Sequence, residues 1–304
     1  MARKTLEKVE TYIEKSRFSN VAKSCRRLFF NHLNQSSKDR GYFHVDQMYG
    51  SGSGVLIRYK GKYFLLTARH VISNNIPGDF QNESPFWITS RFQSKWNSIH
   101  DFLLPRKIWN IGTLIKKNLG AVDSSDVCLI ELFPPLPYHQ PDNFIDIHNA
   151  DTVLTENQHF HGQLLLFSGY PFELNEFDFN QIGDFTHSTI SHRYSVVGAF
   201  VKEDPWGYAS FEKTAGNIQH KNVTGMSGGV VCNIQPKARK VKLAGISVSA
   251  GQNICRFIPS YVFINALLNY EKADSRIIDP ADTNEVDFKI GMDIIFKYLN
   301  EFQK

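Results

Sequence analysis

The chain has 304 residues, of which 42% are hydrophobic and 21% charged, with a formal net charge of +4. This is the composition of a globular protein with a large core, in one big domain or two closely packed ones, and it excludes a disordered chain. Its apolar runs are too short to cross a membrane, and its N-terminus lacks the apolar region of a secretory signal.

The positive charge lies in residues 1–40, which hold ten Lys or Arg and four acidic residues, a net charge of +6 that leaves −2 for the other 264 residues. The body is therefore not expected to bind nucleic acid. Apolar residues recur in steps of three and four from Thr5 to Leu33, which predicts one or two helices, broken near Ser19-Asn20. We interpret this basic helical extension as docked on the body, with an acidic protein partner, a membrane surface or nucleic acid as alternative contacts.

From Gly41 to about Phe257 the chain consists of short apolar, β-branched and aromatic runs that end in Gly, Pro or Asn. This pattern predicts an all-β body. The stretch "RYKGKYF" predicts a hairpin that turns at Lys60-Gly61. The glycines of "GSGSG" at 50–54 precede a strand rather than a helix, so we interpret them as a flexible entry to that strand and not as a phosphate-binding loop.

After Pro259 the pattern becomes helical. Ser260 is a candidate cap for "SYVFINALLNY", and apolar residues from Met292 to Phe302 have helical spacing. The predicted organisation is a helical extension at 1–40, a β body at 41–258 and a helical tail at 259–304.

The cysteines predict neither disulfides nor a metal site. Cys25, Cys128, Cys232 and Cys255 form no close pair, and we interpret them as reduced packing residues. His159 and His161 form an isolated HxH without further ligands at metal spacing, so no metal is expected.

One serine has an unusual setting. In "NVTGMSGGVVCN", Ser227 has Gly225 before it and Gly228 and Gly229 after it, directly ahead of an apolar strand. Glycines let the backbone turn tightly, so the amides of Gly225 and Ser227 can form a nest for a developing oxyanion. A serine hydroxyl is inert without a base, and the base needs an orienting acid.

Candidates for both partners are present. His70 directly follows an apolar strand in "YFLLTARHVI", and Asp126 precedes another in "SSDVCLIEL". An aspartate that enters a buried strand is unfavourable unless it has a partner, and a histidine would be one. Asp123, three residues earlier, is the alternative acid.

These segments resemble the His, Asp and Ser blocks of the trypsin-like (chymotrypsin-fold) serine proteases, and they occur in that family's order. The stretch "LAGISVSAGQNICRFIPSYVFINALL" is similar to the end of bacterial HtrA-type and related cytosolic peptidases. The resemblance covers roughly residues 41–270. It implies two six-stranded β-barrels, at about 41–150 and 151–258, with the active site between them.

The resemblance also implies roles for single residues. His70 would be the general base and then the general acid, Asp126 the orienting carboxylate and Ser227 the nucleophile. The amides of Gly225 and Ser227 would form the oxyanion hole. The strand from Ile246 to Ala250, with Ser247, Val248 and Ser249, would pair with an extended substrate backbone.

Two positions near the serine differ from the secreted digestive members. Met226 stands where those members carry the aspartate that receives a newly cut N-terminus, so that mode of activation is not expected. Lys221 stands where trypsin has the aspartate that selects basic side chains, so cleavage after Lys or Arg is not expected. The alternative is that Lys221 is an exposed loop residue, and His220 and Thr224 could equally shape the pocket. No PDZ domain follows, unlike in HtrA proteins.

The resulting hypothesis is a cytoplasmic serine endopeptidase that needs no cofactor and cleaves a specific protein partner under the control of a protein regulator. The resemblance suggests a bacterial conflict or anti-phage module as its setting. The alternative is a catalytically silent, protease-like scaffold that binds a protein partner.

Overall fold

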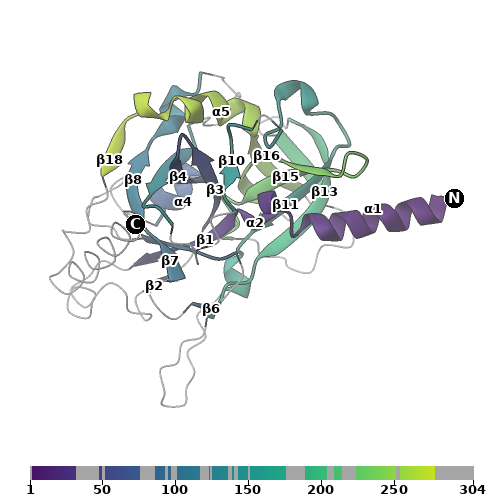
Figure 1. The fold of residues 1–304 in the computed structure, drawn as a ribbon, viewed down its shortest axis with the longest axis horizontal. Coiled ribbons are helices and arrows are strands. Elements are labelled where there is room, and N and C mark those ends of the chain that lie inside the picture. The colour runs from purple at the N-terminus through teal and green to yellow at the C-terminus, as the bar shows by residue number, and fades with distance from the viewer. Residues whose placement is uncertain are drawn as a thin grey trace, which may run out of the picture.

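The computed structural model describes residues 2–31, 48–49, 52–75, 86–92, 95–96, 101–116, 123, 125–135, 139, 143–149, 151–175, 189–203, 209–213, 224–250 and 254–277. Two largely antiparallel sheets lie side by side and form most of this part of the chain (Figure 1). The expectation of a mainly β body is therefore confirmed.

One sheet is a barrel of six strands in which every strand pairs with two neighbours. In order of pairing, the strands are β11 (Leu164–Gly169), β13 (Tyr194–Glu203), β14 (Ala209–Lys213), β17 (Ile254–Pro259), β16 (Lys240–Ala250) and β15 (Val230–Gln235). Side chains such as Phe167, Met226 and Phe257 form a separate core cluster. Strand β15 is buried along almost its whole length, so its apolar residues run continuously instead of alternating.

The other sheet is built mostly from the first half of the chain and follows an open path. Its strands are, in order, β18 (Ser275–Ile277), β8 (Pro105–Trp109), β9 (Cys128–Leu132), β4 (Lys62–Thr67), β3 (Ser53–Tyr59), β1 (Cys25–Asn31), β5 (Phe86–Thr89) and β7 (Phe102–Leu103), with β10 (Ile145–Asp146) on β3 and β2 (Met48–Tyr49) on β1. Only the buried Leu104 separates β7 from β8, so the chain itself links the last strand of this path to the second. The described residues do not establish that this sheet closes into the second expected barrel.

The predicted hairpin at Lys60-Gly61 is confirmed. Tyr59 pairs with Lys62 across a two-residue turn that joins β3 to β4. Both turn residues have positive φ, 49° at Lys60 and 74° at Gly61, as a type I′ turn requires.

The N-terminal segment differs from the prediction in its second half. The helices α1 (Ala2–Ser16) and α2 (Asn20–Lys23) fall where helices were expected, with the break near Ser19. The predicted helix to Leu33 is wrong from Cys25, because Cys25–Asn31 is strand β1, paired with β3 on one edge and β5 on the other. Since β1 is buried on both faces, its apolar residues do not alternate, and their spacing fits a helix equally well.

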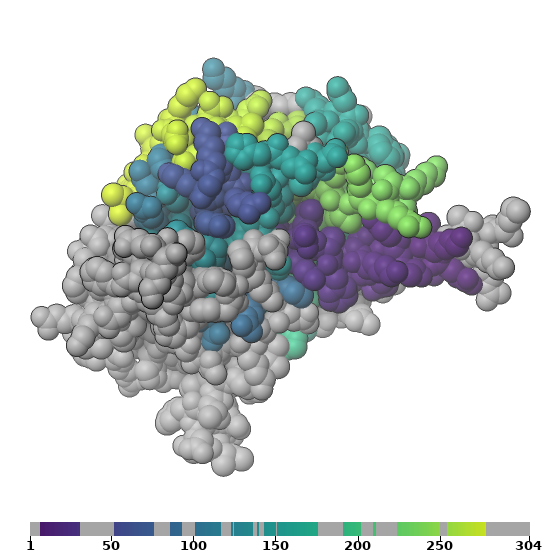
Figure 2. Space-filling model, in the orientation of Figure 1, coloured from purple at the N-terminus to yellow at the C-terminus, as the bar shows by residue number. Residues whose placement is uncertain are grey.

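Helix α1 projects from the barrel side of the molecule (Figure 1) and lies beside the hairpin that joins β15 to β16 (Figure 2). Tyr12 and Ile13 are partly buried against the main core. Below the helix, the guanidinium of Arg193 donates to the carbonyl oxygens of Arg17 and Ala22, and Arg17 Nη1 donates to the Ser195 carbonyl at 2.8 Å. The apolar side of the helix is thus docked at its C-terminal end, as expected.

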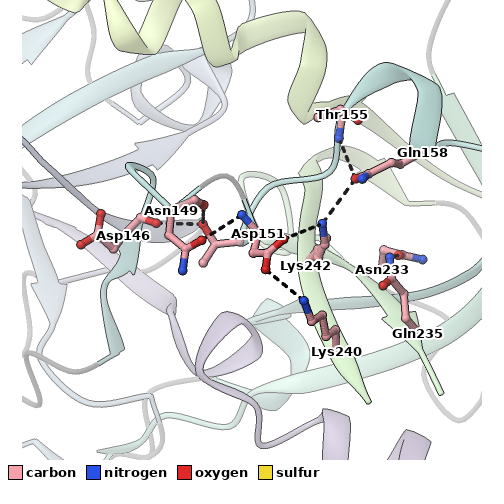
Figure 3. A network of polar contacts seen from close by, with 10 residues as sticks. Asp146, Asn149, Asp151, Thr155, Gln158, Asn233, Gln235, Lys240 and Lys242 are labelled. Atoms are coloured by element: carbon pink, nitrogen blue, oxygen red, sulfur yellow. Dashed lines mark hydrogen bonds and ion pairs between the residues drawn. The ribbon is translucent and has the colours of Figure 1, made fainter. Parts of the chain in front are cut away.

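The connection between the two sheets is tied to both of them. Strand β10 pairs in parallel with β3, and a few residues later Val153 bridges to Leu243 of β16. Asp151 reinforces this attachment because it accepts a hydrogen bond from Lys240 Nζ at 3.0 Å and lies 3.9 Å from Lys242 Nζ (Figure 3). The orientation of one sheet relative to the other is therefore restrained by the chain that joins them.

The tail begins with helix α5 (Ser260–Leu268), as expected, but its predicted cap is wrong. Pro259 occupies the cap position, and the hydroxyl of Ser260 donates instead to the Leu154 carbonyl at 2.7 Å. Ser260 is fully buried, and that carbonyl is the acceptor within its reach. The predicted helix from Met292 to Phe302 lies outside the described residues. Among the helices that are described, none is long and apolar enough to cross a bilayer.

All four cysteines are buried free thiols. Burial raises the pKa of Cys25 to about 11 and raises the pKa of Cys128 and Cys232 still further. Cys25, Cys128 and Cys232 therefore stay protonated near neutral pH, which suits packing and not chemistry.

His159 is a packing residue of the barrel. Its ring contacts Phe200 and Tyr261 edge-on, at centroid distances of 5.8 Å and 5.1 Å, and both ring nitrogens are buried without a hydrogen-bond partner. Burial lowers the pKa of His159 to about 4. Within the described ranges, no group of three His, Cys, Asp or Glu side chains could hold a metal.

His159 makes the fold sensitive to acid. In the folded state its imidazole stays neutral down to about pH 4, whereas the unfolded chain binds the proton from about pH 6.5, so folding stability is lost as the pH falls between these values. We expect His159→Phe to remove roughly 1–3 kcal/mol of that loss, measured by urea unfolding at pH 4.5 and pH 7.5. An equal pH effect in the variant and the wild type would contradict this assignment.

Candidate active site

His70 and Asp126 are brought together by the register of two neighbouring strands. Strand β4 pairs antiparallel with β9, and Thr67 at the end of β4 lies opposite Cys128 at the start of β9. Helix α4 (Arg69–Ser73) follows β4 after one residue, and Asp126 lies two residues before Cys128, so both side chains emerge at the same edge of the sheet. The sequence could predict the two residues but not this register.

The Asp126 carboxylate binds His70 through both of its oxygens. Oδ2 lies 2.8 Å from His70 Nδ1, and Oδ1 accepts the backbone N–H of His70 at 2.9 Å. The second bond fixes the carboxylate relative to the main chain, and the first favours the imidazole tautomer with its proton on Nδ1. Nε2 is then the basic nitrogen. The side chains are 32% and 13% exposed for His70 and Asp126, so the base is open to solvent while the acid is mostly enclosed.

Asp123, the alternative acid, is occupied elsewhere. Its carboxylate accepts hydrogen bonds from the backbone N–H and the hydroxyl of Ser125, and its side chain is exposed. The structure therefore brings Asp126, and not Asp123, to His70.

Ser227 lies in a loop that is anchored on both sheets. The Ser227 carbonyl accepts the N–H of Ser53 in β3 at 2.9 Å, and the Gly228 N–H donates to Ser247 of β16 at 2.7 Å. The Ser53 hydroxyl donates to the Gly225 carbonyl at 2.9 Å. Met226 points into the barrel core and is fully buried, so it contributes packing and not a charge at this position.

Gly228 makes the closest of these contacts. A Cβ at this position would lie 2.0 Å from the Ser53 carbonyl oxygen and 2.2 Å from Thr67 Oγ1, and φ is +78°. Only glycine permits both the approach and this backbone conformation. Thr67 is three residues before His70, so the contact holds the serine loop against the same edge of the sheet that carries the His70–Asp126 pair.

The hydroxyl of Ser227 is directed at the barrel in this structure. It donates to the Val248 carbonyl at 3.1 Å, and within the described residues it makes no hydrogen bond to His70. Val248 is the extra residue of a bulge, because β16 and β17 change register between Ser247 and Ser249. The bulge removes this carbonyl from the strand ladder and leaves it available to the hydroxyl.

The amides of Gly225 and Ser227 are available as donors. In the part of the chain that the structure describes, neither of them donates to a protein acceptor. Gly225 has φ +93°, and a Cβ there would lie 2.8 Å from the Tyr170 carbonyl oxygen. The loop can therefore present N–H groups beside the serine hydroxyl, as an oxyanion site requires.

The end of β16 offers an open edge next to Ser227. Pairing with β15 ends at Ile246, and among the described residues no strand continues it along Val248–Ala250. Ser249 is exposed, whereas Ser247 and Val248 are buried, and the Ser247 hydroxyl has no hydrogen-bond partner. An extended peptide can add to such an edge through backbone hydrogen bonds.

The predicted specificity pocket is described only in part. Thr224 is exposed, and its carbonyl accepts the N–H of Phe172 at 2.7 Å, while Lys221 lies outside the described residues. The Phe172 side chain is 39% exposed beside this loop. Phe172 lies in no recognisable motif, so the sequence did not predict it as a residue beside the specificity pocket.

The sequence also did not predict a role for Ser53 or Thr67, although the glycines beside Ser53 were a signal for it. The predicted flexible entry at Gly50–Gly54 is wrong in its described part, because Gly52 is buried and a Cβ there would lie 2.2 Å from Val71 Cγ1. Closely spaced glycines ahead of a strand indicate a close backbone approach as readily as flexibility.

Neither a protein-family model nor a curated protein sequence matches the chain. The mainly antiparallel β architecture and its six-stranded barrel are compatible with a chymotrypsin-like fold.

The contact at Gly228 gives a prediction about stability. Gly228→Ala places a Cβ on two oxygen atoms, and we expect the free energy of unfolding to fall by about 3 kcal/mol or more. Gly61→Ala is the matched control, because φ is +74° there but no atom lies within 4 Å of the new Cβ. It should lower the free energy of unfolding by only about 1–2 kcal/mol, in urea unfolding of both variants. Equal losses would mean that the close approach of the loop does not matter for stability.

Proposed function

We propose that the chain is a serine endopeptidase in which Ser227 is the nucleophile, His70 the general base and Asp126 the orienting carboxylate. The observation that carries the proposal is the two-point bond between Asp126 and His70 at the edge where the Ser227 loop is anchored. A packing histidine needs one partner at most, and a carboxylate that fixes both the ring and the main chain suits a base that must keep its orientation.

The first half of the proposed reaction forms an acyl-enzyme. The Ser227 hydroxyl turns from the Val248 carbonyl to His70 Nε2, which takes its proton as Oγ attacks the carbonyl carbon of the scissile peptide. The carbonyl oxygen becomes an oxyanion that accepts hydrogen bonds from the amides of Gly225 and Ser227. The C–N bond then breaks, and the His70 imidazolium gives its proton to the leaving amine.

The second half releases the acyl group. Water attacks the ester carbon while His70 takes its proton, the oxyanion forms again, and the Ser227 oxygen leaves and recovers the proton from His70. Asp126 stays ionised and stabilises the imidazolium in both halves. These steps use side chains and backbone amides of this chain together with water.

For the complete β body we propose a double-barrel architecture. The one-residue link between β7 and β8 supports closure of the first sheet by bending at Leu104, with β1, β3, β4, β9, β8/β7 and β5 as its six strands. The active site would then lie between the two barrels, where Gly228 meets Ser53 and Thr67.

The substrate that we propose is an extended segment of a protein. The open edge at Val248–Ala250 supports backbone pairing with such a segment beside Ser227. Lys221 and Thr224 remain the predicted specificity residues, with no preference for cleavage after Lys or Arg.

One observation favours the alternative of a silent scaffold. The Ser227 hydroxyl is bonded to the Val248 carbonyl and not to the base. A serine that never leaves this partner would bind peptides along β16 without cutting them, so a test of serine reactivity separates the two functions.

Reaction with a fluorophosphonate probe tests the proposal. The probe forms a bond between Ser Oγ and phosphorus with loss of fluoride, and it requires an activated serine. We expect the probe to label Ser227 in the wild type and to label nothing at position 227 in Ser227→Ala. In His70→Ala and Asp126→Asn, the labelling of Ser227 should be roughly 10³–10⁴-fold slower. Mass spectrometry of the labelled peptides identifies the residue.

Ser275→Ala is the control, because Ser275 is an exposed serine on β18, away from the proposed site. It should react at the rate of the wild type. Absence of labelling in a folded wild-type chain would favour the scaffold, and labelling that survives Asp126→Asn undiminished would remove Asp126 from its role.

A further inference from the structure

A groove of about 850 Å³ separates helix α1 from the hairpin between β15 and β16. On the space-filling surface, the green hairpin lies next to the purple helix (Figure 2). The residues that line the groove include Lys8, Val9, Tyr12, Lys15, Lys237 and Arg239. None of them has a role in the chemistry proposed above.

The rim of this α1 groove is positively charged. Lys8 and Lys15 lie on the helix, and Lys237 and Arg239 lie on the hairpin opposite. Within the described chain, no carboxylate is within 4.0 Å of any of these four cations. Glu7 is the acidic residue of the lining. In contrast to these four cations, Arg17 forms an ion pair with Glu14, and Lys240 forms one with Asp151.

The floor of the groove is apolar. Val9 and Tyr12 lie on the helix face that turns toward the body, and Pro236 lies on the hairpin, each half-buried. Burial raises the pKa of Tyr12, while the hydrogen bond with Ser16 and the charge of Arg239 oppose that rise. A ligand for this surface needs apolar side chains between its negative charges.

We propose that the α1 groove binds an acidic segment of a partner protein, with carboxylates on the four cations and apolar side chains on the floor between them. The concave shape and the apolar floor favour a peptide over the other polyanions. A membrane-binding helix would expose its apolar face, whereas that face of α1 is turned inward. A nucleic-acid strand would favour exposed aromatic side chains, and Tyr12 is half-buried.

The groove is separate from the proposed active site. Lys240 and Ser247 are seven residues apart on β16, which corresponds to about 23 Å along the strand. Binding in the groove therefore needs no reactive serine, and failure of the protease proposal leaves this inference intact.

Fluorescence anisotropy with a defined probe tests the inference. The probe is a fluorescein-labelled 12-residue peptide with six glutamates interspersed with leucine and glycine, titrated against the full chain carrying Ser227→Ala, so that cleavage cannot consume it. We expect binding at 50 mM salt that weakens as salt rises, because screening reduces interactions between exposed charges. Lys237→Glu combined with Arg239→Glu should weaken binding about tenfold, since several weak charge contacts act together.

A matched double variant is the control. Lys60→Glu with Lys272→Glu makes the same change of charge on exposed residues outside the groove, and Lys60 has φ 49°, close to the 51° of Arg239. It should change affinity less than twofold, and both double variants should keep the wild-type melting temperature.

Four results would overturn the inference. The first three are that the peptide fails to bind, that a peptide with glutamine in place of glutamate binds as tightly, and that the two double variants lose affinity equally. The fourth is that 12-nucleotide oligothymidine or phosphatidylserine vesicles bind more tightly than the peptide at equal salt and lose that binding in the groove variant. That result would assign the groove to a nucleic acid or a membrane instead.

Discussion

The backbone of Gly228 lies so close to Ser53 and Thr67 that no side chain could occupy the space between them. This contact joins the barrel to the first sheet, with Ser227 one residue before Gly228 and Thr67 three residues before His70. The hydrogen bonds of Ser53 to Ser227 and Gly225 depend on the same approach, and so does the position of the serine loop relative to His70. A looser contact would leave each sheet intact but separate the proposed nucleophile from its base.

The two sheets keep this relation because several features hold them together. The main core cluster includes side chains from both sheets and from α5, such as Leu65, Ile246 and Phe263. The connecting segment pairs with β3 at one end and with β16 at the other. Close packing resists small displacements, so the proposed site is built on rigid elements instead of on a hinge.

The sequence predicted those features that depend on local chemistry. The turn at Lys60-Gly61 and the mainly β body follow from residue type and spacing, and His70, Asp126 and Ser227 could each be selected from their neighbours. Features that depend on tertiary contacts could not be predicted. Strand β1 has no alternation because both of its faces are buried, and Ser260 turned to a carbonyl outside its own helix. The choice between Asp123 and Asp126 required the pairing of β4 with β9.

The order of these elements along the chain has a consequence for synthesis. His70 follows β4 and Asp126 precedes β9, and both strands are complete by Leu132, whereas the serine loop and its partner strand β16 follow about a hundred residues later. The contact between Ser53 and Ser227 spans 174 positions, so it cannot form until most of the polypeptide has left the ribosome. A nascent chain would therefore carry a base and its orienting acid long before it acquires a nucleophile. If the proposed peptidase is correct, the ribosome and neighbouring nascent proteins are never exposed to a partly built but reactive site.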